Sequence, residues 1–181
     1  MRKQHSDSAR AGQHRQSSSK RSTNKRRRAG ATISRSTHAI LERLEDRQLL
    51  STSVSFSNGV LTLNGDPKLA NHLTVEQDPT GKNLGANAQG KLLSVSKGSV
   101  KQIVINSGSG ADRIYIDNTI AIPTTINSGD GNDIIKAGAG NATVTAGSGR
   151  DWIAVHGAHT SVKIGNGDST VLGGIGDDTI V

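Results

Sequence analysis

The chain has 181 residues and a formal net charge of +7, a length that suits one domain with a tail. It has no cysteine and only one Trp, one Tyr and one Phe, so disulfides are excluded and a core built on aromatic side chains is disfavoured. No apolar run approaches the roughly 18 residues that a membrane span requires. The charge is uneven: residues 1–50 hold 13 Lys and Arg against four acidic residues, and residues 51–181 hold nine against 11.

Residues 1–36 form a basic segment rich in Ser, Arg, Lys and Gln. Such a composition buries too little apolar surface to offset chain entropy, so we predict a disordered tail. The run from Lys25 to Arg28 offers charges for a polyanion. No aromatic side chain is available there to stack on bases, which favours a solvated or export-related tail over nucleic-acid binding.

Residues 37–51 are predicted to form a short helix, because their apolar side chains fall at helical spacing: Ile40, Leu41 and Leu44. The end of this segment reads Leu44-Glu45-Asp46-Arg47-Gln48-Leu49-Leu50. It resembles the LEPR-x-LL motif of planctomycete surface proteins, with Asp46 in place of the motif's Pro. The resemblance implies an extracellular or cell-surface protein, although residues 29–40 are too polar for a conventional signal peptide.

Residues 52–106 carry alternating patterns that predict β-strands ahead of the repeats. Residues 53–63 are predicted to form a hairpin, since Asn58-Gly59 is a favoured two-residue turn. Its register places apolar side chains on one face in two cross-strand pairs, Phe56 with Leu61 and Val54 with Leu63. Two further strands, separated by a turn and a Gly/Asn-rich loop, are predicted at 72–77 and 91–96. We expect these strands to cap the N-terminal end of the repeat region.

From Ser128 onward the sequence divides into six blocks of nine residues. They read SGDGNDIIK, AGAGNATVT, AGSGRDWIA, VHGAHTSVK, IGNGDSTVL and GGIGDDTIV. Position eight is Ile or Val in all six blocks, and positions two and four are each Gly in five of them. One more block stands at 107–115, and its offset of 21 residues from the next indicates three inserted residues near Pro123. We expect this insertion to form a bulge or a wider coil.

The repeat resembles the hemolysin-type (RTX) calcium-binding nonapeptide, G-G-x-G-x-D-x-U-x, where U is a large aliphatic residue. The last block, residues 173–181, matches at every specified position. Glycine permits the tight turn, the x-U-x half is a short strand with U facing inward, and oxygen ligands suit Ca²⁺. The resemblance implies that two blocks make one coil and that Ca²⁺ ions lie between turns stacked on the same side.

The predicted fold is therefore all-β: a parallel β-roll, or β-helix, of nine-residue repeats over 107–181, capped by the strands of 52–106. Stacking alternate blocks separates the sixth positions into two columns. One column reads Asp112, Asp133, Asp151 and Ser169, and the other reads Thr124, Ala142, Thr160 and Asp178. Asp178 matches the motif but has no following coil, so it is expected to supply only half a site.

The candidate calcium ligands are the aspartates of the first column and their neighbours. The strongest predicted site lies between the turns of Asp133 and Asp151, with Asp130 adding charge nearby. A second is expected between Asp112 and Asp133, where the insertion puts the geometry in doubt. A weaker third would lie between Asp151 and the turn that carries Asp168. The competing interpretation is that aspartate only forms turns, but its recurrence at position six with an 18-residue spacing favours a ligand role.

The leading functional hypothesis is a non-enzymatic, exported or cell-surface protein, structural or adhesive, whose solenoid is completed by calcium. Its expected partners are calcium and a cell-envelope or extracellular polymer. Because the sequence ends on a repeat, end-to-end self-association through an open solenoid end is also expected to be available. Polyanion binding through residues 1–36 is an alternative, and nucleic acid is the less favoured polyanion.

A polysaccharide-acting β-helix enzyme is the other alternative. Enzymes of that class combine carboxylates with cationic side chains along one face, and the repeats offer cations in Arg113, Lys136, Arg150 and Lys163. His156 and His159 share one degenerate turn, but no nucleophile–base spacing is recognisable. Tyr115 and Trp152 occupy outward-facing repeat positions, where we interpret them as edge or capping contacts.

Overall fold

The computed structural model describes residues 51–181. The predicted disordered tail, the predicted helix and the LEPR-x-LL-like motif lie outside these residues. The described part contains fourteen strands and one short 3₁₀ helix, η1 (Lys97–Ser99), so it is all-β, as the repeats predict. Within it, no helix has the length and apolarity to cross a membrane.

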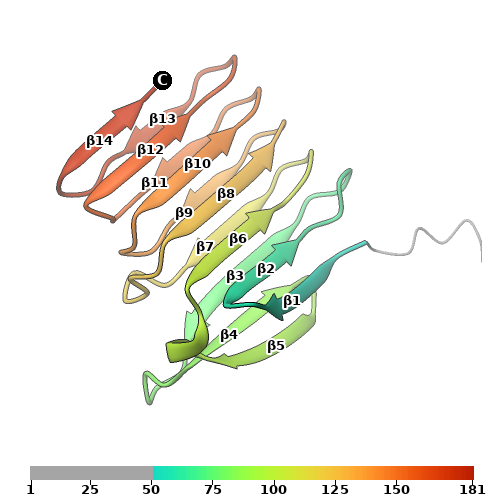
Figure 1. Cartoon of the computed structure of the whole chain (residues 1–181). Coiled ribbons are helices and arrows are strands. Elements are labelled where there is room, and N and C mark those ends of the chain that lie inside the picture. The colour runs from blue at the N-terminus through green and yellow to red at the C-terminus, as the bar shows by residue number, and fades with distance from the viewer. Residues whose placement is uncertain (1–50) are drawn as a thin grey trace, which may run out of the picture. The chain divides into compact units, whose positions relative to one another are not determined.

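Two seven-stranded sheets form the body of the molecule (Figure 1). Sheet A has the order β1-β2-β6-β8-β10-β12-β14. Its strands are β1 (Ser53–Ser57), β2 (Val60–Asn64), β6 (Gln102–Asn106), β8 (Thr124–Gly129), β10 (Ala142–Ala146), β12 (His159–Lys163) and β14 (Asp177–Ile180). Sheet B has the order β13-β11-β9-β7-β3-β4-β5. Its strands are β3 (His72–Gln77), β4 (Asn83–Ala88), β5 (Lys91–Ser96), β7 (Arg113–Ile116), β9 (Ile134–Lys136), β11 (Trp152–Ala154) and β13 (Thr170–Leu172).

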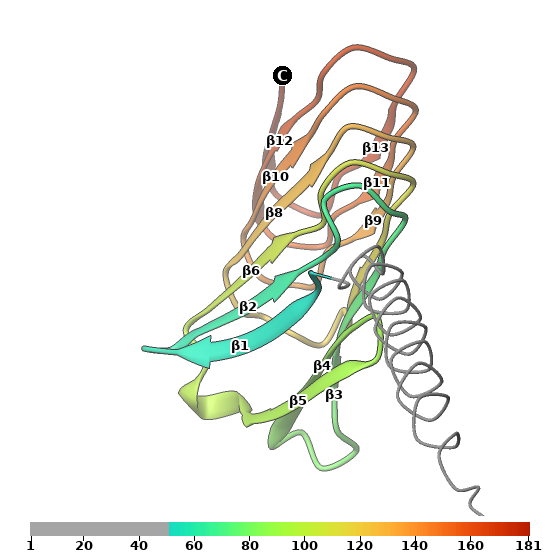
Figure 2. The ribbon, with the colours of Figure 1, turned by 90° about the vertical axis from the view of Figure 1, so that its right-hand side faces the viewer.

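From β6 onward the chain passes alternately from one sheet to the other, so that each coil contributes one strand to each sheet (Figure 2). Pairing between successive coils is parallel. In the regular coils the register advances by 18 residues: Val144 lies beside Val162 in sheet A, and Ile135 lies beside Ile153 in sheet B. The parallel solenoid and its two-block coil, both expected from the repeats, are therefore confirmed.

The three inserted residues lie in the connection between β7 and β8. The pairings β6–β8 and β7–β9 both advance by 21 residues. Asp117 closes the widened turn by accepting hydrogen bonds from the N–H and the hydroxyl of Thr119, each at 2.8 Å. Ile120 and Ile122 fill its inner side. The insertion is thus a wider coil on one side of the solenoid, and the turn that leads into β9 keeps its ordinary length.

The region over residues 52–106, predicted as a cap, contains one strand that was not predicted. The hairpin β1–β2 has the predicted register, with Asn58 and Gly59 at φ values of 51° and 84°, and β3 and β5 coincide with the predicted strands. The prediction of a Gly/Asn-rich loop between β3 and β5 is wrong, because this segment contains strand β4. That strand pairs antiparallel with both β3 and β5. Two-sided pairing outweighs the low strand preference of Asn, Gly and Ala.

Two strands of this region belong to the solenoid itself. β2 pairs in parallel with β6, and β3 pairs in parallel with β7. Solenoid pairing therefore begins at β2, upstream of the first nonapeptide block, while β1, β4 and β5 extend the sheets beyond it. Phe56 in β1 remains 36% exposed, because β1 is the outermost strand of its sheet.

The core is a column of aliphatic side chains supplied by successive strands. The position-eight residues of the first four blocks from Ser128 are fully buried, namely Ile135, Val144, Ile153 and Val162. Ile180 is 49% exposed, since β14 is an outermost strand of sheet A. Alternation along a strand turns position six toward the same side as position eight. The sixth-position side chains therefore enter the interior next to the aliphatic column.

Close contact between coils explains the glycine at position four. A Cβ on Gly131 would stand 1.9 Å from the carbonyl oxygen of Gly110, and one on Gly149 would stand 1.9 Å from that of Gly131. The φ values of Gly131 and Gly149 are 139° and 145°, a region that residues with a Cβ rarely adopt. Backbone atoms, rather than side chains, therefore fill the space between successive turns at this position.

Candidate metal centre

The turns that precede β3, β7, β9, β11 and β13 form the carboxylate stack. The residue that ends each turn, position six in the nonapeptides, is in chain order Asn71, Asp112, Asp133, Asp151 and Ser169. The exposed fractions of the three aspartates are 1%, 1% and 3%. Neighbouring strands in a sheet are about 4.8 Å apart, so three carboxylates form a buried column along the solenoid axis.

One oxygen of each carboxylate holds the stack together. Asp112 Oδ1 accepts the N–H of Asn71 at 2.7 Å. Asp133 Oδ1 accepts the N–H of Asp112 at 2.9 Å, and Asp151 Oδ1 accepts the N–H of Asp133 at 3.1 Å. The 21-residue step between Asp112 and Asp133 thus keeps the same contact as the 18-residue step that follows. The insertion near Pro123 leaves this column continuous.

The second oxygen of two carboxylates has no partner. Oδ2 of Asp112 and Oδ2 of Asp133 are buried and receive no hydrogen bond within residues 51–181, and the same is true of Ser128 Oγ. The carbonyl oxygens of Gly110 and Gly131, in the same turns, also accept no backbone hydrogen bond from the described residues. A buried polar atom left unpaired costs about 1–3 kcal/mol, and more when it is charged. The turns therefore contain oxygen atoms that lack a hydrogen-bond partner and are available to coordinate a cation.

The chemistry of these donors fits calcium. Ca²⁺ takes six to eight oxygen ligands, from carboxylates and backbone carbonyls, in flexible geometry. Within residues 51–181 no group of three or more His, Cys, Asp or Glu side chains converges, so an ion held at this stack would also need backbone carbonyl oxygens of the glycine turns as ligands. Nitrogen- and sulfur-preferring transition metals do not match a donor set made only of oxygen.

The column is electrostatically unfavourable when all of it is ionised. Burial, and to a smaller extent the charges on Asp112 and Asp151, raise the pKa of Asp133 to about 6, against the opposing effects of the Asp112 N–H and of the nearby Ser128 hydroxyl. Two carboxylates about 4.8 Å apart repel by roughly 3 kcal/mol at an effective dielectric constant of about 20. A bound cation or a bound proton relieves this repulsion. The column is therefore more stable in its cation-bound or its protonated state than when it is fully ionised and empty.

Neutral side chains close the column at both ends. Asn71 Nδ2 donates to the carbonyl oxygen of Ser107 at 2.8 Å and to Asp112 Oδ1 at 3.0 Å. At the other end, the hydroxyl of Ser169 accepts the N–H of Asp151 at 3.1 Å and donates to Asp151 Oδ2 at 3.3 Å. Asp151 therefore differs from the two other aspartates, because its second oxygen has a partner. The unpaired carboxylate oxygens thus belong to two neighbouring members of the stack, Asp112 and Asp133.

Sequence reasoning missed Asn71, because the turn over residues 65–71 does not fit the nonapeptide. A signal was present in the Leu63-Asn64 pair ahead of that turn, which repeats as Ile105-Asn106 and Ile126-Asn127 ahead of the next two. The asparagines of these pairs form a hydrogen-bonded ladder in sheet A. Asn106 donates to Asn64 at 3.0 Å, and Asn127 donates to Asn106 at 2.9 Å.

The other predicted ligands lie elsewhere. Asp130 is exposed in the turn before β9, where its Oδ1 accepts the N–H of Ser148 at 2.8 Å. Asp168 is exposed in the turn before β13. Asp178 is partly buried on the other side of the solenoid, and its Oδ1 accepts the N–H of Thr160 at 3.1 Å. None of the three joins the buried column.

The turns that precede β8, β10, β12 and β14 form the opposite stack. Its sixth-position residues lie beside one another in the predicted register: Thr124, Ala142, Thr160 and Asp178. The first three are buried, and Asp178 is the one carboxylate among them. Thr160 Oγ1 is buried without a partner in the described residues. Because this stack has a single carboxylate, no two neighbouring sixth positions in it are both negatively charged.

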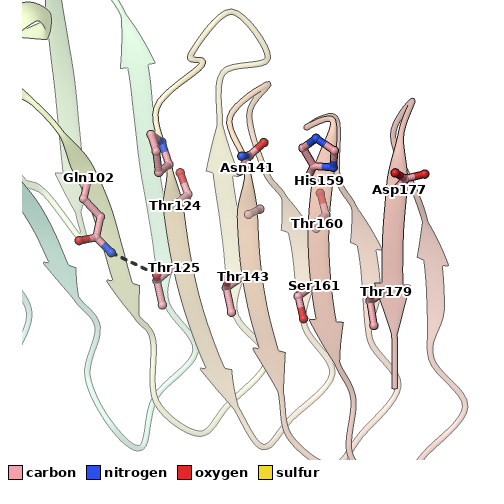
Figure 3. Close-up of a pocket in the computed structure, with 12 residues that line it drawn as sticks. Gln102, Thr124, Thr125, Asn141, Thr143, His159, Thr160, Ser161, Asp177 and Thr179 are labelled. Atoms are coloured by element: carbon pink, nitrogen blue, oxygen red, sulfur yellow. Dashed lines mark hydrogen bonds between the residues drawn. The ribbon is translucent and has the colours of Figure 1, made fainter.

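A groove of about 430 Å³ crosses the outer side of sheet A at the start of these strands. Figure 3 shows two rows of polar side chains along it. One row consists of Thr125, Thr143, Ser161 and Thr179, and the other of Asn141, His159 and Asp177. His156 lies apart from this lining and contacts the carbonyl oxygen of Ala137 through Nδ1 at 3.0 Å. The two histidines of the degenerate turn thus engage different neighbours.

A parallel solenoid whose glycine turns bury a column of carboxylates defines a calcium-binding roll. In agreement, the family model of the RTX calcium-binding nonapeptide repeat matches residues 124–153 and 165–181 in four copies. These repeats bind calcium, and a structural calcium-binding fold is what they build. The gap between the matched ranges holds the block at 155–163, in which His156 and Ala158 replace the usual glycines. No curated protein and no solved structure shows significant similarity to the chain.

Proposed function

We propose that this protein is an exported, non-catalytic structural protein whose roll is completed by about two calcium ions in the carboxylate stack. One ion would lie between the turns of Asp112 and Asp133, and the other between those of Asp133 and Asp151, so that Asp133 is shared. The observation that carries the proposal is the pair of buried oxygens without partners, Oδ2 of Asp112 and Oδ2 of Asp133.

In this proposal calcium supplies the positive charge that the column lacks. The chain does the rest: the ladder of N–H to Oδ1 bonds positions the carboxylates, the glycine turns bring successive coils together, and burial of the aspartates excludes water. Because the site exists only in the folded turns, the binding free energy adds to the stability of the folded state. Calcium therefore acts as a structural cofactor.

Two observations support export. Proteins with RTX repeats are typically secreted, and residues 44–50 resemble a surface-protein motif. We expect a dissociation constant of about 10⁻⁴–10⁻³ M, the range of extracellular calcium modules, because few carboxylates serve each ion. Antibody labelling of intact and permeabilised cells tests the location. Labelling that requires permeabilisation would contradict export.

Calorimetric titration of the full chain with calcium chloride tests the site. We expect about two ions per chain for the wild type, about one for Asp112→Asn or Asp151→Asn, and a loss of both for Asp133→Asn. Asp168→Asn is the matched control, because Asp168 belongs to the same stack but is exposed; it should keep the wild-type number. An unchanged ion count in Asp133→Asn, or no binding by the wild type, contradicts the proposal.

A further inference from the structure

The outer face of sheet B carries an unusual set of side chains. The outward positions of β7, β9 and β11 present Arg113, Tyr115, Ile134, Lys136 and Trp152, which we call the aromatic–basic face. The set includes the only Tyr and the only Trp of the chain. Tyr115 is 38% exposed and Ile134 is 39% exposed. Aromatic side chains are scarce in this protein, so their gathering on one exposed face needs a reason.

The strand register makes this face continuous. Arg113 lies beside Ile134, which lies beside Trp152, and Tyr115 lies beside Lys136. Neighbouring strands are about 4.8 Å apart, and alternate residues of a strand are roughly 6.6 Å apart. Lys136 Nζ lies over the Trp152 ring, 5.6 Å from its centroid. A cation and an aromatic ring are therefore presented together to a ligand.

The charge of this face is opposite to that of its surroundings. Residues 51–181 carry nine Lys and Arg against 11 acidic residues, yet no acidic residue occupies an outward position of β7, β9, β11 or β13. The groove on sheet A has the contrasting composition, because its lining contains no Lys, Arg, Tyr or Trp. Trp, Tyr and Arg are the residues that most often dominate binding energy at interfaces.

We propose that the aromatic–basic face binds an acidic polysaccharide, a chain of sugar rings that carry carboxylates. The apolar face of a sugar ring packs on the rings of Tyr115 and Trp152. A carboxylate on that ring accepts paired hydrogen bonds from the guanidinium of Arg113 or one from the ammonium of Lys136. The flat row of parallel strands offers an extended surface to an extended polymer.

Other anionic partners fit this face less well. Nucleic acid carries a dense row of phosphates, and the aromatic–basic face supplies only two cations for them, Arg113 and Lys136. An anionic membrane would require the apolar side chains to enter the lipid together, but Arg113 and Lys136 stand among them. A polymer with one carboxylate per sugar ring matches alternating cations and rings.

Binding of a short, soluble oligouronate to the full chain in excess calcium tests the proposal, with a neutral oligosaccharide of equal length for comparison. A short oligomer avoids gelation by calcium. Arg113→Gln with Lys136→Gln removes the charges, and Tyr115→Ala with Trp152→Ala removes the rings. Thr143→Ala with Ser161→Ala, on the outer side of sheet A, is the control. We expect each pair on the aromatic–basic face to weaken binding at least about tenfold and the control to stay within about twofold.

Melting temperatures with and without calcium are recorded for every variant, so that loss of fold, or failure of the calcium site, is distinguished from loss of binding. The Gln pair keeps the packing of the face and tests the charges alone. Absence of oligouronate binding overturns the proposal. Binding that both face pairs leave unchanged also overturns it and directs attention to the basic tail. Tighter binding of anionic vesicles or of single-stranded DNA, lost in the same variants, assigns the face to that class instead.

Discussion

The two stacks of turns share close contact between successive coils and differ in what they bury. The carboxylate stack places Asp112, Asp133 and Asp151 in a column, whereas the opposite stack has Thr124, Ala142 and Thr160 in the corresponding places. Both stacks bring coils into close contact: a Cβ on Gly131 would stand 1.9 Å from a carbonyl oxygen, and one on Gly140 would stand 2.1 Å from another. The opposite stack packs without a column of charge. The costly burial of three carboxylates therefore points to a ligand rather than to packing.

The largest effect is expected from Gly131→Ala, which disrupts the close contact between coils that both stacks have. Its Cβ would meet the carbonyl oxygen of Gly110 at 1.9 Å, at a φ of 139°. We expect a loss of at least about 4 kcal/mol in the free energy of unfolding, together with loss of the calcium response. Denaturant titration measures it. Gly98→Ala, where no atom lies within 4 Å of the new Cβ, is the control, and a wild-type midpoint for Gly131→Ala would contradict the close stacking.

An intermediate effect is expected from pH, which acts on the carboxylate stack through Asp133. Without calcium, the pKa of Asp133 is about 6 in the folded protein against an ordinary 3.8. The folded state then binds the proton more tightly than the unfolded state, so stability is highest while the carboxyl is protonated and falls as the pH rises from about 4 to about 6. The fall amounts to at most about 3 kcal/mol.

Denaturant midpoints measured in chelator across this pH range test the sign. Asp133→Asn removes the titrating group and should flatten the profile, whereas Asp168→Asn should leave it unchanged because Asp168 is exposed. Stability of the calcium-free wild type that increases over this range would show that the column carries no burial penalty.

A smaller effect is expected from Thr160→Asp, which makes the opposite stack resemble the carboxylate stack. Thr160 is buried next to Asp178, whose Oδ1 accepts its N–H at 3.1 Å. The new carboxylate should lower stability in chelator by about 1–3 kcal/mol and add a rise in melting temperature with calcium. Thr160→Asn is the uncharged control. If calcium fails to stabilise Thr160→Asp beyond this control, charge at position six is not what separates the stacks.

Much of the roll could be predicted from the sequence because its periods are strict. The nine-residue period predicts position eight as core, and the two-block coil that the RTX resemblance implies predicts which sixth positions stack, as the pairing of Ala142 with Thr160 confirms. The hairpin at Asn58-Gly59 was equally readable, since its turn demands positive φ. Local turn chemistry, the nine-residue period and the RTX resemblance together are sufficient for these elements.

The remaining features depend on contacts that no period records. Strand β4 forms because β3 and β5 offer it pairing on both edges. The effect of the insertion depends on which turn absorbs it, and the contact between Asp112 and Asp133 shows that the carboxylate stack does not. Asp130 was predicted to be near the calcium site because it is close to Asp133 in the sequence. Its carboxylate instead accepts a hydrogen bond from a neighbouring turn at the surface. Whether an aspartate is buried is set by its inward or outward position.

Thermal unfolding of the wild type and Asp133→Asn, each with calcium and with chelator, tests the central claim most directly. In chelator the variant should melt above the wild type, because the amide removes a buried charge from the column. In calcium it should melt below the wild type, because the shared ligand is lost. A packing defect would lower both temperatures and cannot produce this crossing. A variant that melts lower in both conditions, or a wild type that calcium does not stabilise, would contradict the account.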